Sequence, residues 1–254
     1  MWTRSRGSTY VLQTTFGMTM TNLSVYLRFG RRLMVEAFHH HPLAKITILT
    51  RGKIAEYQAT VAARHPFLPD VWATMDGLKL TIEQPSTDVT QSRYYNEWTH
   101  GHYVSSVFCF APDGTIPIAF FNIPGSVHGS QIAEWGNVYV KWERGFEETG
   151  GKCTVDSAFG CKQRQFLIQS SQADMVLNLD TDGERQAEVR MKMSATSMRQ
   201  SAEWGMHSVQ SSFPRLKDTF IYEEGGERRI VLKMLVLLNN LRARMVGINQ
   251  IKNT

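Results

Sequence analysis

The segment "YVSSVFCFAPDGTIPIAFFNI" at residues 103–123 decides the fold class. Two apolar runs flank the turn tetrapeptide "PDGT", and this pattern predicts a β-hairpin. The segment "VWATMDGLKLTIE" at 71–83 predicts another strand, with Asp76 in its middle. A short strand is predicted again in "KCTVDSAFG" at 152–160, which carries Asp156.

Helices are predicted on both sides of this hairpin. In the helix predicted at 19–38, Thr21 is the expected cap, and Gly30 is expected to weaken or break the helix in its middle. Pro42 after "HHH" indicates a helix end rather than a metal site. The polar segment 162–193 is hard to assign, and part of it is expected to be disordered. The order of helices, strand, hairpin, helix and strand is typical of an α/β fold. The predicted helices cover residues 19–38, 51–64, 130–149, 196–213 and 227–245.

Composition excludes several classes of protein. With 254 residues, of which 42% are hydrophobic and 20% charged, the chain can form a core and is not globally disordered. Its three cysteines show no C-x₂-C spacing, so reduced thiols are expected and not a zinc knuckle. No secretory signal is visible, and the longest apolar run, 230–241, is shorter than the ~20 residues of a membrane span. We therefore expect no membrane partner.

The basic charge is confined to the N-terminal part of the sequence. Residues 1–53 contain eight lysines and arginines against Glu36 alone, a net charge of +7, while the remainder carries −2. This asymmetry indicates either a polyanion partner such as nucleic acid or a solubilising basic end. Both interpretations stay open on charge alone.

The helix at 19–38 carries the candidate DNA contacts. Arg28, Arg31 and Arg32 could line a phosphate-facing side, and Asn22 at the helix start could touch base edges, as in a recognition helix. An ordinary amphipathic helix with solvated arginines is the alternative.

Three carboxylates are the candidate catalytic residues: Asp76, Asp156 and Glu203. Glu203 borders the apolar stripe of the helix at 196–213 and can therefore reach a sheet edge. Three converging carboxylates need a cation, and oxygen ligands favour Mg²⁺ or Mn²⁺. Two such ions would suit a nuclease. Each acid also has a local alternative: Glu203 could pair with Arg199, Asp76 could serve the turn at Gly77, and Asp156 could cap the next stretch of backbone.

A resemblance favours the catalytic interpretation. The sequence resembles the DDE transposases of the PIF/Harbinger superfamily over nearly all of residues 65–251. The segments that carry it are "VWATMDGLKL" (71–80), "YYNEWTHGHYVSSVFCFAPDGTIPIAFFNIPGSVHGSQIAE" (94–134), "CTVDSAFG" (153–160), "RQSAEWGM" (199–206), "SFPRLKD" (212–218) and "LNNLRARMVGINQI" (238–251).

The resemblance implies both a fold and a reaction. The family's acids correspond to Asp76 in its "DG" motif, Asp156 in its second Asp motif and Glu203 on the following helix, 47 residues beyond Asp156. The implied fold is ribonuclease-H-like, with a mixed central sheet. The implied activity is metal-dependent cleavage of DNA at element ends and transfer of the freed 3′ hydroxyl to target DNA, with two Mg²⁺ or Mn²⁺ ions. Asp156 would then face a metal ion shared with Asp76.

The sequence departs from the family pattern at one position near the site. Gly129 stands where the family motif "GSxHDS" has Asp, while His128 is retained. An Asp here could cap the adjoining helix, a role in which Ser130 could replace it, or could hold His128 or a metal-bound water. The chain is also shorter than the usual family member, as expected of a truncated or degenerate copy.

We therefore predict two parts. Residues 1–65 would form a basic, helix-turn-helix-like DNA-binding segment, and residues 66–254 the ribonuclease-H-like endonuclease domain. The predicted function is that of a nuclear, transposase-derived DNA endonuclease and strand transferase. A catalytically impaired or domesticated DNA- or protein-binding module of the same fold is the alternative. DNA, a separate Myb-like protein and a homo-oligomer are the expected partners.

Overall fold

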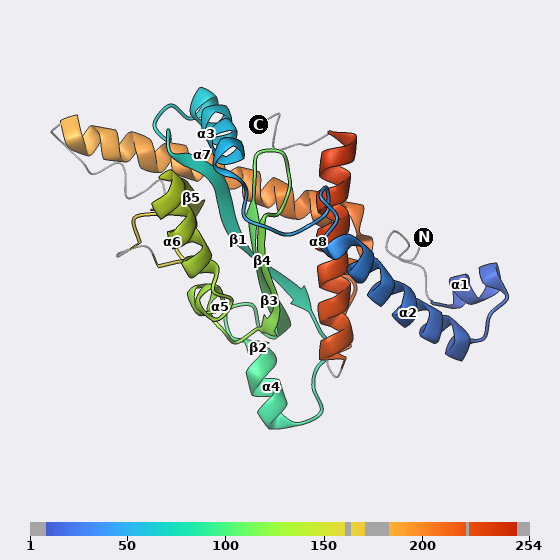
Figure 1. The fold of residues 1–254 in the computed structure, drawn as a ribbon. Coiled ribbons are helices and arrows are strands. Elements are labelled where there is room, and N and C mark those ends of the chain that lie inside the picture. The colour runs from blue at the N-terminus through green and yellow to red at the C-terminus, as the bar shows by residue number, and fades with distance from the viewer. Residues whose placement is uncertain (1–8, 161–163, 171–182, 222–223, 248–254) are drawn as a thin grey trace.

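A mixed β-sheet with helices on both faces forms the body of the protein (Figure 1). The computed structural model describes residues 9–160, 164–170, 183–221 and 224–247. The strands are β1 (Val71–Thr81), β2 (Tyr95–Asn96), β3 (Gly101–Phe110), β4 (Ile118–Pro124), β5 (Lys152–Val155) and β6 (Leu167–Gln169). The helices are α1 (Thr9–Phe16), α2 (Met20–His39), α3 (Arg51–Arg64), α4 (Asp88–Tyr94), α5 (Gly129–Trp135), α6 (Val138–Thr149), α7 (Gly183–Ser212), the 3₁₀ turn η2 (Pro214–Lys217) and α8 (Gly225–Val246).

The strand order is β2-β3-β1-β5-β6, and β4 pairs with β3. β1 pairs antiparallel with β3, and β3 pairs antiparallel with β4, which confirms the predicted strand and hairpin. β5 and β6 continue the sheet in parallel, beginning beside β1. The central strand β1 therefore lies between an antiparallel half and a parallel half, and the α/β prediction is confirmed.

Alternation along the central strands divides the core into two layers. Met75 of β1 faces a cluster formed with α3, α5 and α6, whereas Leu78 and Leu80 face a cluster formed with α7 and α8. On β3, Cys109 belongs to the first cluster and Phe108 to the second. Buried side chains on both sheet faces give a three-layer arrangement that fixes β1 from both sides.

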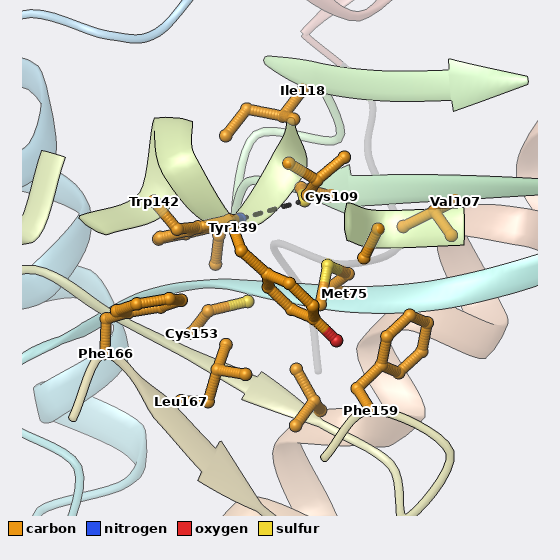
Figure 2. Packing of buried hydrophobic residues seen from close by; sticks show 14 of the residues in the cluster. Met75, Val107, Cys109, Ile118, Tyr139, Trp142, Cys153, Phe159, Phe166 and Leu167 are labelled. Carbon is orange, nitrogen blue, oxygen red and sulfur yellow. Dashed lines mark hydrogen bonds between the residues drawn. The ribbon is translucent and has the colours of Figure 1, made fainter. Parts of the chain in front are cut away.

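The first cluster packs around Trp142 of α6 (Figure 2). The Trp142 ring lies 4.7 Å from the ring of Trp72, and its indole Nε1 donates a hydrogen bond of 3.3 Å to Cys109 Sγ. Cys109 and Cys153 are free and buried, and burial raises the pKa of the Cys109 thiol to about 12. Both therefore act as small apolar core residues, in agreement with the expectation of reduced thiols.

The N-terminal helices do not form a layer of their own. α2 packs along α8, and α1 lies beyond it on the side away from the sheet (Figure 1). α3 contributes Ile54 and Tyr57 to the first core cluster and contacts β1. Residues 51–64 are thus built into the same core as the sheet. The boundary predicted at residue 65 stays a prediction.

The helix predicted at 19–38 forms, but two of its predicted details are wrong. Its N-cap is Thr19, whose Oγ1 accepts a hydrogen bond from the backbone N–H of Asn22, and not Thr21. α2 also runs unbroken through Gly30 to His39. A glycine inside a helix costs only about 1 kcal/mol relative to alanine, and packing along α8 is sufficient to offset that.

The single helix predicted at 130–149 is in fact two helices, α5 and α6. They are separated at Gly136 and Asn137, and Asn137 adopts a left-handed conformation with φ of 51°. Gly136 lies so close to Phe120 of β4 that a Cβ would come within 2.4 Å of the ring. This close approach, which no local pattern shows, turns the chain between the two helices.

The helix predicted at 196–213 is also longer than expected, because α7 begins at Gly183. The segment 162–193 therefore contains β6 and the first part of α7, while residues 161–163 and 171–182 lie outside the described residues. The last helix matches its predicted range closely. Within the described ranges, no helix has the length and apolar character needed to cross a bilayer.

Candidate active site

The pairing of β1 with β5 brings two of the predicted acids together. Met75 and Val155 are partners in this parallel pair, so Asp76 and Asp156 follow them at equivalent positions of neighbouring strands. Because both strands run in the same direction, Asp76, midway along β1, lies beside Asp156, which directly follows the end of β5. The juxtaposition is a consequence of sheet register across 80 residues of sequence.

Asp76 and Asp156 line one cleft of about 600 Å³. β1, the loop after β2, the start of α5 and the turn after β5 form its walls. His128 and Gly129 at the start of α5 also line this cleft, and their predicted role beside the acids stays a prediction. Lys79, Asn96 and Trp98 also line the cleft, and sequence analysis had not selected them. The feature of the sequence that could have pointed to them is a tryptophan in the polar run "NEWTHG".

Each aspartate also makes the local contact that was the alternative interpretation. Asp76 Oδ1 accepts a hydrogen bond of 2.7 Å from the backbone N–H of Gly77. Asp156 Oδ1 accepts one of 2.9 Å from the backbone N–H of Ala158. These bonds use one oxygen of each carboxylate and hold the side chains in place. The local and the catalytic interpretations therefore do not exclude each other.

Burial raises the pKa of Asp76 to about 6, from an ordinary value of 3.8. The hydrogen bond from Gly77 and the charge of Arg199 oppose this rise, and the charges of Asp156 and Glu203 add to it. Two carboxylates with a desolvated member form a site in which a cation would relieve unfavourable charge. Asp76 is thus a buried carboxylate whose ionised form is disfavoured by desolvation.

Glu203 reaches this charge cluster through an arginine. Arg199 Nη2 on α7 lies 2.8 Å from Glu203 Oε1, one turn away on the same helix, and Arg199 Nη1 lies 3.9 Å from Asp156 Oδ2. The Glu203 side chain is 54% exposed, and Glu203 is not among the residues that line the cleft. The alternative pairing of Glu203 with Arg199 is therefore observed, and Arg199 links the glutamate to Asp156.

The donor set of the cleft suits a hard divalent cation in part. Asp76 and Asp156 offer carboxylate oxygens, which Mg²⁺ and Mn²⁺ prefer. The backbone hydrogen bonds from Gly77 and Ala158 engage Oδ1 of each aspartate and not Oδ2. Among the described residues, however, no three or more His, Cys, Asp or Glu side chains are grouped so that they could hold a metal ion. The structure thus brings Asp76 and Asp156 to one cleft, whereas Glu203 pairs with Arg199.

His128 and Gly129 occupy the entrance of α5. His128 is the N-cap residue, without a side-chain capping bond, and its Nδ1 lies 3.0 Å from Ser130 Oγ. Gly129 is therefore the first residue of the helix and not its cap, and Ser130 contacts the histidine and does not cap the helix. A Cβ on Gly129 would meet Phe159 at 3.5 Å and Ala158 at 3.7 Å, which are ordinary contacts. The position has room for a larger side chain.

The predicted DNA-contacting arginines of α2 lie away from this cleft, along α8. Arg28 Nη2 is 2.8 Å from Glu224 Oε1, and Arg32 Nη2 is 2.6 Å from Glu227 Oε1. Both arginine side chains remain more than half exposed. Burial lowers the pKa of Arg31, against the opposing charges of Glu227 and Glu224. Asn22 is exposed in the first turn of α2.

Neighbouring aspartates offer the carboxylate oxygens that Mg²⁺ and Mn²⁺ prefer, and such ions serve phosphoryl transfer in phosphatases, polymerases and nucleases. The family model described as DDE superfamily endonuclease matches residues 75–240, a range that includes Asp76, Asp156 and Glu203. The chain belongs to this family of DDE superfamily endonucleases. No curated protein and no solved structure matches it. The family suggests a transposase-like nuclease that acts on DNA with divalent metal.

Proposed function

We propose that this protein is a transposase-derived, metal-dependent DNA endonuclease and strand transferase of the PIF/Harbinger type. The observation that carries the proposal is the side-by-side placement of Asp76 and Asp156 in one cleft, set by the parallel register of β1 and β5. Membership of the DDE endonuclease family supports the reaction class. The Harbinger subtype rests on the sequence motifs around Asp76, Asp156 and Glu203.

The sheet supports a ribonuclease-H-like core. β3 pairs antiparallel with β1 and with β4, and β5 and β6 extend the sheet in parallel on the other side of β1. A connection through α5 and α6 leads from the hairpin to β5. Asp76 lies on the central strand β1, and Asp156 directly follows the parallel neighbour β5, which supports the arrangement of acids that the resemblance implies.

In this proposal Asp76 and Asp156 hold Mg²⁺ or Mn²⁺, and Glu203 completes the set of ligands, with two ions at full occupancy. A bound divalent ion would polarise phosphoryl oxygens and lower the pKa of bound water. Glu203 has to exchange its contact with Arg199 before it can take this role. The Arg199 guanidinium, freed of Glu203, stays near Asp156 and can bind a phosphate oxygen of DNA.

A second candidate function is a DNA- or protein-binding module that has lost catalysis. The contact of Arg199 with both Asp156 and Glu203 favours it, because the guanidinium supplies the positive charge that a cation would otherwise bring. Gly129, in place of the family's Asp, points the same way. The two candidates share the fold and differ in whether the acids hold metal and cleave.

DNA contact through α2 and nuclear localisation are further parts of the proposal. Arg28, Arg32 and Arg31 keep a basic face beside Glu224 and Glu227. The pair of Arg28 with Glu224 is exposed and weak, so Arg28 can exchange it for a phosphate, while Arg32 keeps its own side chain 64% exposed beside the mostly buried Glu227. A protein that acts on element ends in chromosomal DNA would work in the nucleus. A separate Myb-like protein stays a prediction from the resemblance.

A second copy of the chain is the proposed occupant of the outer face of α2. Val25, Tyr26, Phe29 and Leu33 form one stripe along α2 and are 51–63% exposed. Aromatic side chains bury about 150–250 Å² each, so this stripe offers roughly 450 Å² per copy and about 900 Å² in a two-fold dimer, the range of weak interfaces. α2 projects from the body, so two copies can approach without contact between their sheets (Figure 1).

Sedimentation equilibrium tests this dimer. Phe29→Asp should shift the chain to monomer at concentrations where the unchanged protein dimerises. Val89→Asp, at a residue that is 77% exposed on α4, is the matched control and should have no effect. A chain that stays monomeric at all concentrations, or a dimer insensitive to Phe29→Asp, contradicts the dimer without bearing on the nuclease.

Cleavage of a DNA fragment bearing the element's own ends, in Mn²⁺, tests the nuclease. Asp76→Asn, Asp156→Asn and Glu203→Gln should each abolish cleavage, while the exposed Asp88→Asn on α4 should leave it unchanged. Calorimetry should show loss of Mn²⁺ binding in the two aspartate variants. If the unchanged protein binds DNA but neither binds Mn²⁺ nor cleaves, the binding-module candidate replaces the nuclease.

A further inference from the structure

Trp98 is an almost completely exposed tryptophan on the wall of the acidic cleft. Its exposed fraction is 89%, the largest value among the exposed large apolar residues of the described chain. Trp98 lines the same cleft as Asp76 and Asp156. A tryptophan left in water forgoes one of the largest burial energies of any side chain, and its place on the wall of a cleft puts this exposed ring where a ligand could cover it.

The loop that carries Trp98 is held rigidly. It joins β2 to β3, and the pair Asn96–Gly101 closes it. Asn96 Oδ1 accepts hydrogen bonds from Thr99 N at 3.2 Å and from Thr99 Oγ1 at 2.9 Å, and Asn96 Nδ2 donates to the Gly125 carbonyl at 2.8 Å. His100 completes the turn with φ of 50°. The exposed ring is therefore presented from a fixed turn and not from a loose end.

The same asparagine also positions a cation. Lys79 Nζ on β1 donates a hydrogen bond of 3.1 Å to Asn96 Oδ1, and Lys79 lines the cleft together with Trp98. One residue, Asn96, thus ties an aromatic ring and an ammonium group to the wall that holds Asp76. An aromatic platform beside a positive charge is the chemistry that binds a nucleotide: the ring stacks on a base and the cation contacts phosphate.

We propose that Trp98, backed by Lys79, is a stacking platform for an unpaired base of the DNA strand whose phosphate lies at Asp76 and Asp156. This rests on the proposed nuclease function and deepens it, because the substrate would then be a DNA end with at least one base out of the duplex. The cleft of about 600 Å³ is in the usual size range of ligand sites. A base pair inside the duplex cannot offer its face to the ring, since its neighbours cover it, and a terminal pair offers only its outer face.

Equilibrium binding of labelled DNA, followed by anisotropy in Ca²⁺, tests the platform. Three short duplexes are compared: one fully paired, one with an unpaired tail, and one whose tail is abasic. Base stacking on an aromatic ring is worth ~1–3 kcal/mol, so the tail with bases should bind about 5- to 150-fold more tightly than the abasic tail. Trp98→Ala should remove this preference, and Trp98→Phe should keep most of it.

Two variants separate stacking from general effects. Trp135→Ala, at a tryptophan that is 60% exposed and does not line the cleft, should leave the preference intact. Lys79→Met should weaken all three DNAs alike and flatten the salt dependence, because a phosphate contact carries no base information.

The platform is overturned if the abasic tail binds as well as the tail with bases, or if Trp98→Ala keeps the preference. The latter result would point to a protein partner at Trp98. These outcomes differ from failure of the nuclease proposal, which is read from cleavage and Mn²⁺ binding of the Asp76→Asn variant and not from base preference.

Discussion

Arg199 Nη2 lies 2.8 Å from Glu203 Oε1, one turn along α7. The same guanidinium lies 3.9 Å from Asp156, so one cation contacts the second and third predicted acids at once. If those acids are metal ligands, Arg199 competes with the metal for them. The position of this arginine therefore bears on both candidate functions. In a metal-dependent nuclease a cation would replace Arg199 at these acids, and in a binding module Arg199 would remain their counter-charge.

Arg199→Gln should therefore increase the affinity for Mn²⁺ at pH 8, where Asp76 is ionised. Partly exposed ion pairs are worth ~0.2–1 kcal/mol, so we expect a gain of up to about five-fold, measured by calorimetry. Arg144→Gln breaks an ion pair of the same i,i+4 geometry on α6, between Arg144 and Glu148, and should change nothing. Unaltered Mn²⁺ affinity in Arg199→Gln would show that Arg199 does not compete with metal.

Asp76 should make the stability of the metal-free protein fall as pH rises. Its folded pKa is about 6 and its ordinary value is 3.8, so between these values the folded state keeps a proton that the unfolded state has lost. Stability decreases across that window, and above it the penalty is constant. A difference of this size corresponds to about 3 kcal/mol at most.

Asp76→Asn removes this penalty and still accepts the hydrogen bond from Gly77. Relative to the unchanged protein, the variant should gain up to about 3 kcal/mol at pH 8 and little at about pH 4, as measured by urea unfolding in chelator. Asp88→Asn serves as the control. An equal effect of Asp76→Asn at both pH values would be incompatible with a raised pKa.

Gly129→Asp should raise the rate of DNA cleavage with little change in melting temperature. The position is the first of α5, its Cβ would make only ordinary contacts with Phe159 and Ala158, and it lies on the wall of the cleft beside His128. A carboxylate that orients a ligand or a bound water typically changes affinity or activity ~10–100-fold. Gly129→Asn, of similar size and neutral, is the matched variant.

If the Gly129 protein cleaves as fast as its Asp variant, the departure from the family motif has no catalytic effect. If Gly129→Asn restores cleavage as well as Gly129→Asp does, the gain comes from hydrogen bonding and not from charge.

The α2 arginines should contribute to DNA affinity through charge. If Arg28 and Arg32 each contact one phosphate, replacing both with Gln should reduce the slope of log affinity against log salt by about 2. Anisotropy titrations at several salt concentrations measure this slope. The loss of the exposed ion pair between Arg28 and Glu224 should cost only ~0–1 kcal/mol of stability, and the loss of the Arg32 pair should cost more because the Glu227 side chain is only 15% exposed.

The matched change is Glu224→Gln with Glu227→Gln, which breaks the same ion pairs but leaves the arginines charged. It should tighten DNA binding. An unchanged slope in the arginine variant would mean that these residues serve only the packing of α2 on α8.

The sequence alone predicted most of the strands and selected Asp76 and Asp156 as candidate site residues. Apolar runs around "PDGT" and at 71–83 specify strands because their pattern and turn chemistry are local, and they appear as β1, β3 and β4. Family motifs pointed to Asp76 and Asp156, and the sheet register places these two side by side. The apolar stripe of α7 likewise predicted the face that packs on the sheet.

Only the tertiary structure decided the rest, because those features depend on contacts between distant segments. The break between α5 and α6 follows from Gly136 against Phe120, and the partners of Arg28 and Arg32 are acids about 195 residues away. Trp98 lines the cleft only because folding brings the β2–β3 turn beside β1. The raised pKa of Asp76 could not be predicted from the sequence either, since a pKa is set by burial and by neighbours that folding brings together.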